Sequence, residues 1–415
     1  MSEKINFAWP ATAVSKEDYD VILNCVHSNI NLFKHKKIMI FGAGARGTVI
    51  SVILESEGYC DILFTDNNAE KWGGYIDRYP IVPPQTALAM REEVIILIST
   101  EEGHPIKEQL EKNGLIEGTD FFFPISNLYD KYIYEFKRET KNDILVMGDC
   151  MFEVISFNDV NKDSLAEIFV RKLGYDKIKL LTMHGMGMRA FYHVLKAQEK
   201  MGMQPDIFIV MINFETLTGK QHLLPRSQHT ELIQQVFSVV KGLDDGELEE
   251  YVKITKDRVK NIQAEFFTTN KFSSNATTNE KGEISSNAAK LFFKLNYMYK
   301  LNPEIESVQY LIKILKYAKE KNFRVIPFIP PVNYELGRKL FGEKFEEAYQ
   351  HNYQIIDNIV KEHGHDLLDL SHICKKELFA AHSTPDETTN YEGRSKIAYR
   401  IIQEIERIRE AENEH

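Results

Sequence analysis

Short apolar runs that alternate with helix-like segments are the strongest constraint that this sequence places on its fold. Each run is long enough for one buried strand, and each is followed by a segment with the composition of a helix. Strands that alternate with helices predict parallel sheets with right-handed crossovers, so we predict an α/β fold. The runs cover residues 37–42, 61–66, 94–98, 144–148, 178–182, 207–212, 324–329 and 366–370.

The charged stretch from Lys137 to Asp143 separates two series of these runs and predicts a linker. We therefore predict a first domain over residues 1–135 and a second over residues 140–415, each large enough to bury its own core. Between about residues 227 and 302 the strand pattern stops, and a charged helical segment is followed by a polar tract. This predicts a helical insertion in the second domain.

Composition excludes several classes of partner. The net charge is -10, with basic residues interleaved among acidic ones, so we expect a small-molecule or glycan substrate and no nucleic acid. No apolar run approaches the ~20 residues of a membrane span, and the first residues do not have the pattern of a secretory signal. The four cysteines show no paired spacing. We therefore predict a cytoplasmic protein with reduced thiols and no integral membrane segment.

A glycine-rich loop follows the first strand run and fits the pattern GxGxxG. Glycines at such a loop let the backbone approach a phosphate, and the following helix N-terminus stabilises its charge. A carboxylate that ends the second run is placed to bind a ribose hydroxyl. The predicted nucleotide-binding residues are Gly42, Gly44, Arg46, Gly47 and Asp66.

The alternative is that these glycines serve only tight packing between helix and strand. The domain has only about 100 residues before the linker, which predicts one mononucleotide half and argues against NAD. Through IFGAGARG, FTDNNAEKWGG and YPIVPP it resembles the small Rossmann-like domains of surface-glycan enzymes, including those that precede sugar acyltransferases. That resemblance implies either a bound nucleotide or nucleotide-sugar, or a scaffold.

Gly148-Asp149-Cys150, directly after a strand run, resembles the GDS block of the SGNH/GDSL hydrolase and acyltransferase superfamily, with cysteine in place of the nucleophilic serine. The resemblance implies an SGNH-like parallel sheet flanked by helices. We expect Cys150 at a strand-to-helix corner, where a helix N-terminus would lower the pKa of its thiol. The alternative is a buried structural cysteine.

Two further segments are similar to the family's next blocks, whose donors stabilise the oxyanion of acyl transfer. The segment from Thr182 to Gly187 places Gly185 and Gly187 as amide donors. The segment Ile212-Asn213-Phe214-Glu215 supplies Asn213, or Glu215 if the register shifts by two residues.

The last block departs from the family. Asp386 precedes the final helix as in the DxxH block, but Thr389 stands where the catalytic histidine belongs, and threonine cannot accept the proton of the nucleophile at neutral pH. His382 and His184 are the candidate bases.

A polar stretch after the third block, residues 220–229, is predicted either to line the substrate cleft or to cap a helix. His184, His222, Arg226 and His229 are the candidate substrate-binding residues, with Arg226 suited to a phosphate or carboxylate. Residues 327–382 also resemble the C-terminal half of the proteins that D-alanylate teichoic acids, which supports ester or acyl-transfer chemistry in glycan assembly.

Three functions follow as hypotheses. The first is an SGNH-like esterase or acyltransferase acting on a sugar or cell-surface glycan precursor. The second is a catalytically degenerate glycan- or nucleotide-binding protein. The third is a nucleotide-dependent sugar oxidoreductase or epimerase, although no TyrxxxLys pair follows the glycine loop. No metal is expected, because the histidines form neither HExxH nor HxH.

Overall fold

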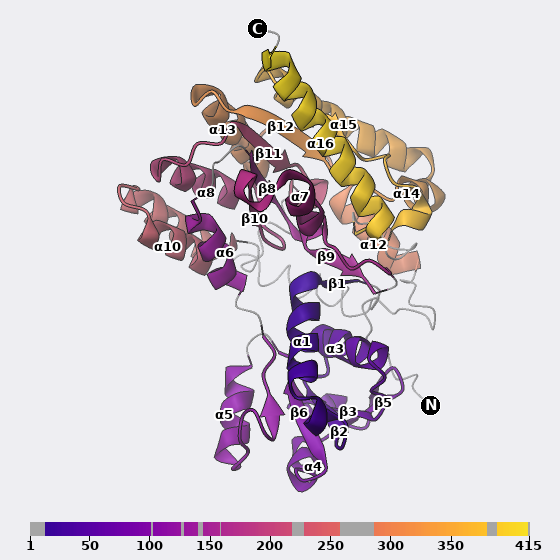
Figure 1. The fold of residues 1–415 in the computed structure, drawn as a ribbon. Helices are drawn as coiled ribbons and strands as arrows, with labels where there is room; N and C mark the ends of the chain where they lie inside the picture. The colour runs from indigo at the N-terminus through magenta and orange to yellow at the C-terminus, as the bar shows by residue number, and fades with distance from the viewer. Residues whose placement is uncertain are drawn as a thin grey trace. The chain divides into compact units, whose positions relative to one another are not determined.

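The computed structural model describes residues 13–100, 103–125, 128–139, 144–157, 159–217, 228–257, 286–379 and 388–413. The chain forms two compact units that divide between residues 127 and 128. Each has its own sheet and its own core (Figure 1). The α/β fold predicted from the sequence is confirmed. Helix α6 (Leu128–Lys137) belongs to the second unit, whereas the sequence analysis ends the first domain at residue 135.

The first unit contains a six-stranded sheet in the order β4-β5-β3-β2-β6-β7. Its neighbouring strands run parallel except for the antiparallel pair β4 and β5. Numbered along the chain, the parallel strands lie in the order 3-2-1-4-5 of the Rossmann fold, whose crevice lies between strands 1 and 4. The strands are β2 (Lys37–Phe41), β3 (Ile62–Thr65), β4 (Tyr75–Ile76), β5 (Tyr79–Val82), β6 (Val94–Ile98) and β7 (Phe121–Phe122).

Helices pack on this sheet through its alternating apolar side chains. Ile106 and Leu110 of α5 contact the face that Met39 and Phe41 present, while α3 packs with β2 and with α1. The remaining elements are β1 (Ala13–Ser15), α1 (Lys16–Ser28), α2 (Ile30–Phe33), α3 (Ala45–Ser56), η1 (Ala69–Lys71), α4 (Pro84–Ala89) and α5 (His104–Lys112).

The second unit contains a fully parallel five-stranded sheet in the order β10-β8-β11-β12-β13. Numbered along the chain within this sheet, the order is 2-1-3-4-5, which is the flavodoxin-like doubly wound arrangement. The order reverses between β8 and β11, so the crevice of this fold lies at their carboxyl ends. The strands are β8 (Ile144–Gly148), β10 (Ile178–Thr182), β11 (Ile207–Met211), β12 (Arg324–Ile329) and β13 (Leu368–Asp369).

Two cores lie on opposite faces of this sheet (Figure 1). One face carries α6, α8 (Met188–Lys200), α10 (Thr230–Val239), α13 (Glu306–Glu320), α14 (Tyr334–Phe341) and α15 (Glu343–Glu362). The other carries α7 (Leu165–Leu173) and α16 (Tyr391–Asn413). Shorter or peripheral elements are η2 (Cys150–Phe152), β9 (Val154–Ser156), η3 (Tyr175–Lys177), α9 (Phe214–Leu217), a helix over 245–257, α12 (Ser286–Asn296) and η5 (Lys376–Leu378).

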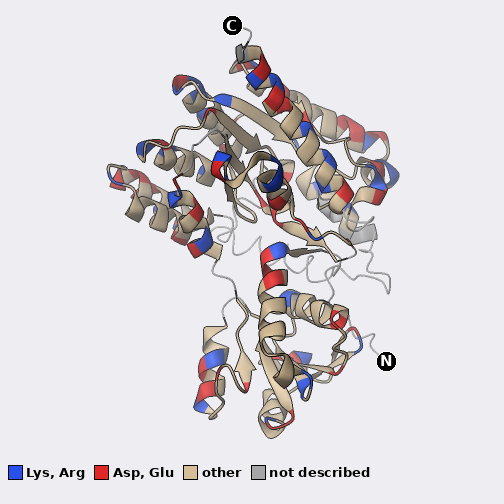
Figure 2. Ribbon diagram, viewed as in Figure 1, with Lys and Arg blue, Asp and Glu red and all other residues tan. Residues whose placement is uncertain are grey.

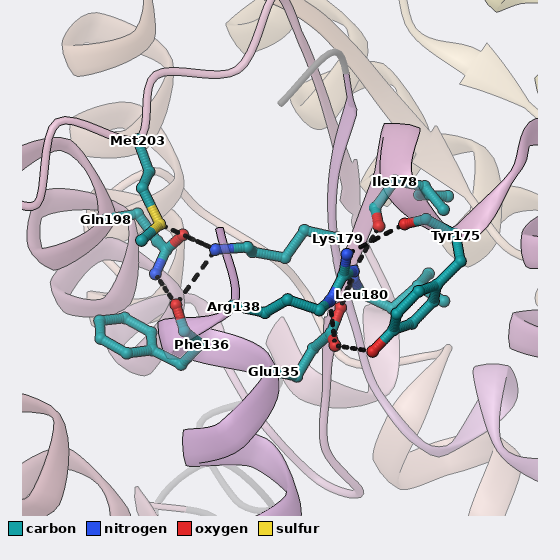
Figure 3. A network of polar contacts seen from close by, with 9 residues as sticks. All are labelled: Glu135, Phe136, Arg138, Tyr175, Ile178, Lys179, Leu180, Gln198 and Met203. Carbon is teal, nitrogen blue, oxygen red and sulfur yellow. Dashed lines mark hydrogen bonds and ion pairs between the residues drawn. The ribbon is translucent and has the colours of Figure 1, made fainter. Parts of the chain in front are cut away.

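A buried lysine ties α6 to the sheet of the second unit (Figure 3). Lys179 on β10 is 2% exposed, and its Nζ donates hydrogen bonds to the Phe136 carbonyl at 3.1 Å and to Gln198 Oε1 at 2.9 Å. Arg138 at the end of α6 donates to the Ile178 carbonyl at 2.6 Å. The first helix of the second unit is therefore held by polar bonds as well as by apolar packing.

Charges of both signs are interspersed along the helices of the second unit, as on α16 (Figure 2). None of the helices within the described ranges combines the length and the apolar character needed to cross a bilayer.

Candidate functional site

The residues that follow β8 and β11 meet at the point where the strand order reverses. Asp149 directly follows β8, and Asn213 lies two residues beyond β11. Asn213 Nδ2 donates a hydrogen bond of 2.9 Å to Asp149 Oδ2. In open α/β sheets, ligands bind outside the carboxyl ends of the strands at this reversal. The two side chains therefore mark the candidate site of the second unit.

The carboxyl group of Asp149 is buried and hydrogen-bonded on both oxygens. It is 2% exposed, and Oδ1 accepts a hydrogen bond from the Met151 amide at 3.0 Å. Burial raises the pKa of Asp149, while the bonds from Met151 and Asn213 act in the opposite direction; burial prevails. Asp149 is thus an internal anchor for the turn that carries Cys150.

Asn213 is held in one orientation by its own bonds. Its Oδ1 accepts from the Glu215 amide at 2.9 Å, and its side chain is only 1% exposed. Of the two residues that the sequence left open, Asn213 is the one that bonds to Asp149. Its role as an oxyanion donor stays a prediction.

The turn around Cys150 differs from the sequence expectation. A three-residue 3-10 helix, η2, follows Asp149 and leads directly into β9, and the first α-helix begins only at Leu165. The α-helix N-terminus expected at Cys150 is therefore not present at this turn. Cys150 itself is partly exposed, unlike the buried Cys374.

Gly148 has a packing role at this turn. A Cβ at this position would lie 2.3 Å from Cε2 of Phe152. The ring of Phe152 therefore packs directly over the glycine backbone and fixes the path of the chain through Cys150.

The register of β8 and β10 places Cys150 and His184 at equivalent positions beyond the ends of adjacent strands. Thr182 on β10 pairs with Gly148 on β8, so His184 and Cys150 each lie two residues beyond a directly paired position. The backbone amide of Met183 also donates to the Gly148 carbonyl at 3.2 Å. The exposed His184 and the partly exposed Cys150 thus leave adjacent strands at the same level.

Glu153 is a carboxylate at this edge that the sequence analysis missed. Its Oε1 accepts a hydrogen bond of 3.1 Å from the Thr182 hydroxyl, which joins the turn after β8 to the end of β10. Its position three residues after Cys150 could have indicated a residue near the site. Nothing in the sequence indicated that Thr182 is its hydrogen-bond partner.

The two glycines of the second block have different environments. Gly185 has φ of +66°, a left-handed conformation that favours glycine, and it is partly buried. Gly187 is buried and forms the N-cap of α8 with extended backbone. Gly185 is therefore the better placed of the two to offer an amide to a ligand.

His229 was predicted to contact substrate, and the structure places it in the interior. It is 2% exposed, its Nε2 donates to the His184 carbonyl at 2.9 Å, and its Nδ1 faces the Tyr129 hydroxyl at 3.3 Å. Direct substrate binding by this ring is excluded in this conformation, because both nitrogens are engaged within the chain. His222, Arg226, His382 and Asp386 lie outside the described residues.

The glycine loop of the first unit occupies the carboxyl end of β2, as predicted. Gly42 has φ of +119°, and Gly44 is the N-cap of α3. A Cβ on Gly47 would lie 2.1 Å from the carbonyl oxygen of Gly42, so Gly47 is required for close packing of α3 against the loop. The packing interpretation therefore accounts for Gly47 without a ligand.

The charged residues predicted to bind a nucleotide are engaged within the first unit. Arg46 Nη2 donates to Asp18 Oδ1 at 2.9 Å and to the Pro124 carbonyl at 2.6 Å. Asp66 Oδ2 accepts from the Ala43 amide at 2.8 Å and from Lys71 Nζ at 2.7 Å. Burial opposes ionisation of Asp66, but hydrogen bonds led by that of Lys71 prevail and hold its pKa below the usual value.

The sheet of the first unit is also larger than the mononucleotide half expected from its length. Strands β6 and β7 extend it on the far side of β2, which completes the order 3-2-1-4-5. Strand β6 has five residues and β7 only two, so a domain of this length holds more of the sheet than one mononucleotide half.

Among the described residues, no group of three or more His, Cys, Asp or Glu side chains is arranged to hold a metal ion. No protein-family model matches the sequence, and no curated protein matches it significantly. The fold and the site define an α/β protein whose second sheet reverses its strand order between β8 and β11, with Asp149 and Asn213 at that reversal.

Proposed function

We propose that the second unit is an SGNH-like esterase or acyltransferase that carries its acyl group on Cys150. The observation that supports this most directly is the bond between Asp149 and Asn213 at the strand reversal. It holds the Cys150 turn at the position where this fold class binds ligands.

The reaction begins with loss of the thiol proton of Cys150. Sγ then attacks the ester carbonyl carbon, the carbon–oxygen bond to the alcohol breaks, and the departing alkoxide takes up a proton. The resulting thioester passes its acyl group to water in an esterase, or to a sugar hydroxyl in an acyltransferase. The Gly185 amide is the proposed donor to the oxyanion that forms in each half-reaction.

His184 is the proposed acceptor for the thiol proton. It leaves β10 at the same level as Cys150 leaves β8, it is exposed, and imidazole is the side chain that most often serves as a general base. His382, the other candidate from the sequence, lies outside the described residues.

The proposed substrate is an acylated sugar or a precursor of a cell-surface glycan, as the resemblance of residues 327–382 implies. The proposed location is the cytoplasm. None of the four cysteines, all of which lie within the described ranges, forms a disulfide, which supports a reducing compartment.

The test uses p-nitrophenyl acetate with the full-length chain. Release of p-nitrophenol is followed, and the acyl adduct is located by intact mass and peptide mapping. Cys60→Ala is the matched control, because Cys60 is the exposed thiol most prone to non-specific acetylation. We expect acetyl on Cys150, with turnover lost in Cys150→Ala and kept in Cys60→Ala. Equal rates in the two variants would remove the nucleophile assignment.

A glycan-binding protein without turnover is the second candidate. The short 3-10 turn after Cys150 favours it, because no long helix N-terminus activates the thiol. Under this function Cys150 remains unmodified in the same experiment.

A further inference from the structure

His229 joins two elements of the second unit across the end of β10. It precedes α10, and its ring lies between Tyr129 of α6 and the turn that follows β10. The ring centroids of His184 and His229 are 5.7 Å apart, in an edge-to-face arrangement. His229 is thus the internal support of the segment that carries His184 and Gly185.

The hydrogen bonds define the tautomer of His229. A carbonyl oxygen only accepts, so Nε2 carries the hydrogen that it donates to His184, and Nδ1 accepts from the Tyr129 hydroxyl. Burial, with a smaller contribution from His184, lowers the pKa of His229 to about 4. The ring is therefore neutral near pH 7, as this pair of bonds requires.

The backbone of His229 is also strained. Its φ of +44° lies in the left-handed region, which is unfavourable for a non-glycine residue. The surrounding bonds and packing must offset that cost.

The bond from His229 to the His184 carbonyl also fixes the orientation of the Gly185 N–H. In a trans peptide, the carbonyl of His184 and the N–H of Gly185 lie in one plane and point in opposite directions. Holding the carbonyl against His229 therefore turns the Gly185 N–H away from α6 and α10. That N–H makes no hydrogen bond to any described residue.

The Cys150 turn packs on the face of the sheet opposite to α6 and α10. Helices α6 and α10 cover one face of the sheet, whereas Met151 and Phe152 of the Cys150 turn pack with α7 in the core of the other face (Figure 1). The His184–Gly185 peptide therefore accepts the His229 bond on the face covered by α6 and α10, and directs its Gly185 N–H toward the opposite face.

We propose that His229 is a positioning residue that aims the Gly185 amide at the oxyanion, an inference that rests on the proposed acyl transfer at Cys150. His229 acts through the His184–Gly185 peptide and does not touch the substrate.

Selective labelling tests the orientation directly. The sequence has two His-Gly pairs, His184–Gly185 and His363–Gly364. Histidine labelled with ¹³C at the carbonyl and glycine labelled with ¹⁵N therefore give two amide signals in a carbonyl-correlated spectrum of the full-length chain. Gly364, in the turn after α15, is the internal reference.

The variant is His229→Gln, and its matched control is His193→Gln, a second buried histidine that lies on α8 among aromatic rings. We expect His229→Gln to move the Gly185 signal and leave Gly364 unchanged, and His193→Gln to move neither. With p-nitrophenyl acetate, His229→Gln should lower kcat about tenfold or more with little change in KM, because a donor to the transition state is misaimed. Tyr129→Phe is the milder second variant and should move Gly185 less.

An unmoved Gly185 signal in His229→Gln, or a kcat equal to that of His193→Gln, would overturn the proposal. If the wild-type chain shows no turnover, the acyl-transfer function fails and the catalytic role of His229 fails with it. The Gly185 signal then still decides whether His229 orients the peptide.

Discussion

Asn213 Nδ2 lies 2.9 Å from Asp149 Oδ2, and this bond connects the turns that follow β8 and β11. Both side chains are buried, so neither can replace the other's bond with water. The bond therefore stabilises both the fold and the floor of the candidate site.

Replacing Asn213 by alanine should destabilise the second unit. The change leaves Asp149 Oδ2 without its amide donor, at a cost of about 1–3 kcal/mol in the free energy of unfolding near pH 7. Urea unfolding measures this loss, with Asn358→Ala on the exposed side of α15 as the matched control. Equal midpoints for the two variants would contradict the expectation.

The effect of Asn213→Ala should also depend on pH. The pKa of Asp149 is raised on folding, so its ionisation costs stability above the folded pKa, and acidification through that pKa relieves the cost. Because Asn213 stabilises the charged carboxylate, the difference between wild type and variant should shrink as the pH falls and Asp149 becomes protonated. A difference that grows in acid would show that the carboxylate is not the group stabilised.

Substitutions at Gly44 and Gly47 test whether the glycines of this loop are needed for packing. Gly47→Ala places a Cβ 2.1 Å from the Gly42 carbonyl oxygen, whereas a Cβ on Gly44 has nothing within 4 Å. We expect Gly47→Ala to cost about 1–3 kcal/mol through overpacking, and Gly44→Ala about 0.5 kcal/mol through the poorer N-cap. Thermal unfolding monitored by circular dichroism compares them. Equal stability would mean that the loop relaxes around the added methyl group.

Much of the strand framework could be predicted, because buried parallel strands are continuous apolar runs. The run at residues 178–182 coincides with β10, and that at residues 37–42 exceeds β2 by one residue. The Gly148-Asp149-Cys150 block was expected to lead into a helix, but the ring of Phe152 packs over Gly148 and the chain turns into β9. This long-range packing is invisible to a local pattern.

The interior position of His229 could not be predicted for a similar reason. Its partner Tyr129 lies 100 residues earlier in the chain, and the second partner is a backbone carbonyl 45 residues away. A histidine in a polar stretch has the composition of a cleft residue whether its ring faces solvent or the interior. Only the fold distinguishes the two positions.

Lys179→Met should alter the pH dependence of stability. Burial lowers the pKa of Lys179 to about 8 from 10.5, so between these values the unfolded chain binds more protons and the free energy of unfolding rises with pH. The stability of the wild type relative to Lys179→Met should therefore increase between about pH 8 and pH 10.5. The Phe136 carbonyl keeps a partner in the variant, because Gln198 Nε2 also donates to it at 2.8 Å.

Urea unfolding across that pH range measures the change, and Lys177→Met, at an exposed position two residues earlier, is the matched control. The control should follow the wild-type pH dependence. If Lys179→Met also follows it, the buried ammonium does not titrate in this range.

The buried ion pair of Arg394 and Asp159 should be strongly coupled. Their side chains are 1% and 7% exposed, and Arg394 Nη2 lies 2.7 Å from Asp159 Oδ2. Arg394 also donates to the carbonyls of Asp163 at 3.0 Å and Thr389 at 2.5 Å. One guanidinium thus holds the start of α16 against the segment that precedes α7.

Arg394→Met should cost about 3–5 kcal/mol, because it leaves the Asp159 carboxylate buried without its cation. Asp159→Asn removes that charge, so the double variant should be more stable than the sum of the single losses, with a coupling of about 0.5–3 kcal/mol. Urea unfolding of the four proteins completes the cycle, and Arg400→Met at an exposed position of α16 controls for the loss of a surface arginine.

Strict additivity of the two losses would show that water reaches Asp159 once Arg394 is gone. In that case Arg394 stabilises α16 mainly through its two carbonyl bonds, and Arg394→Lys should then recover part of the loss even in the presence of Asp159→Asn.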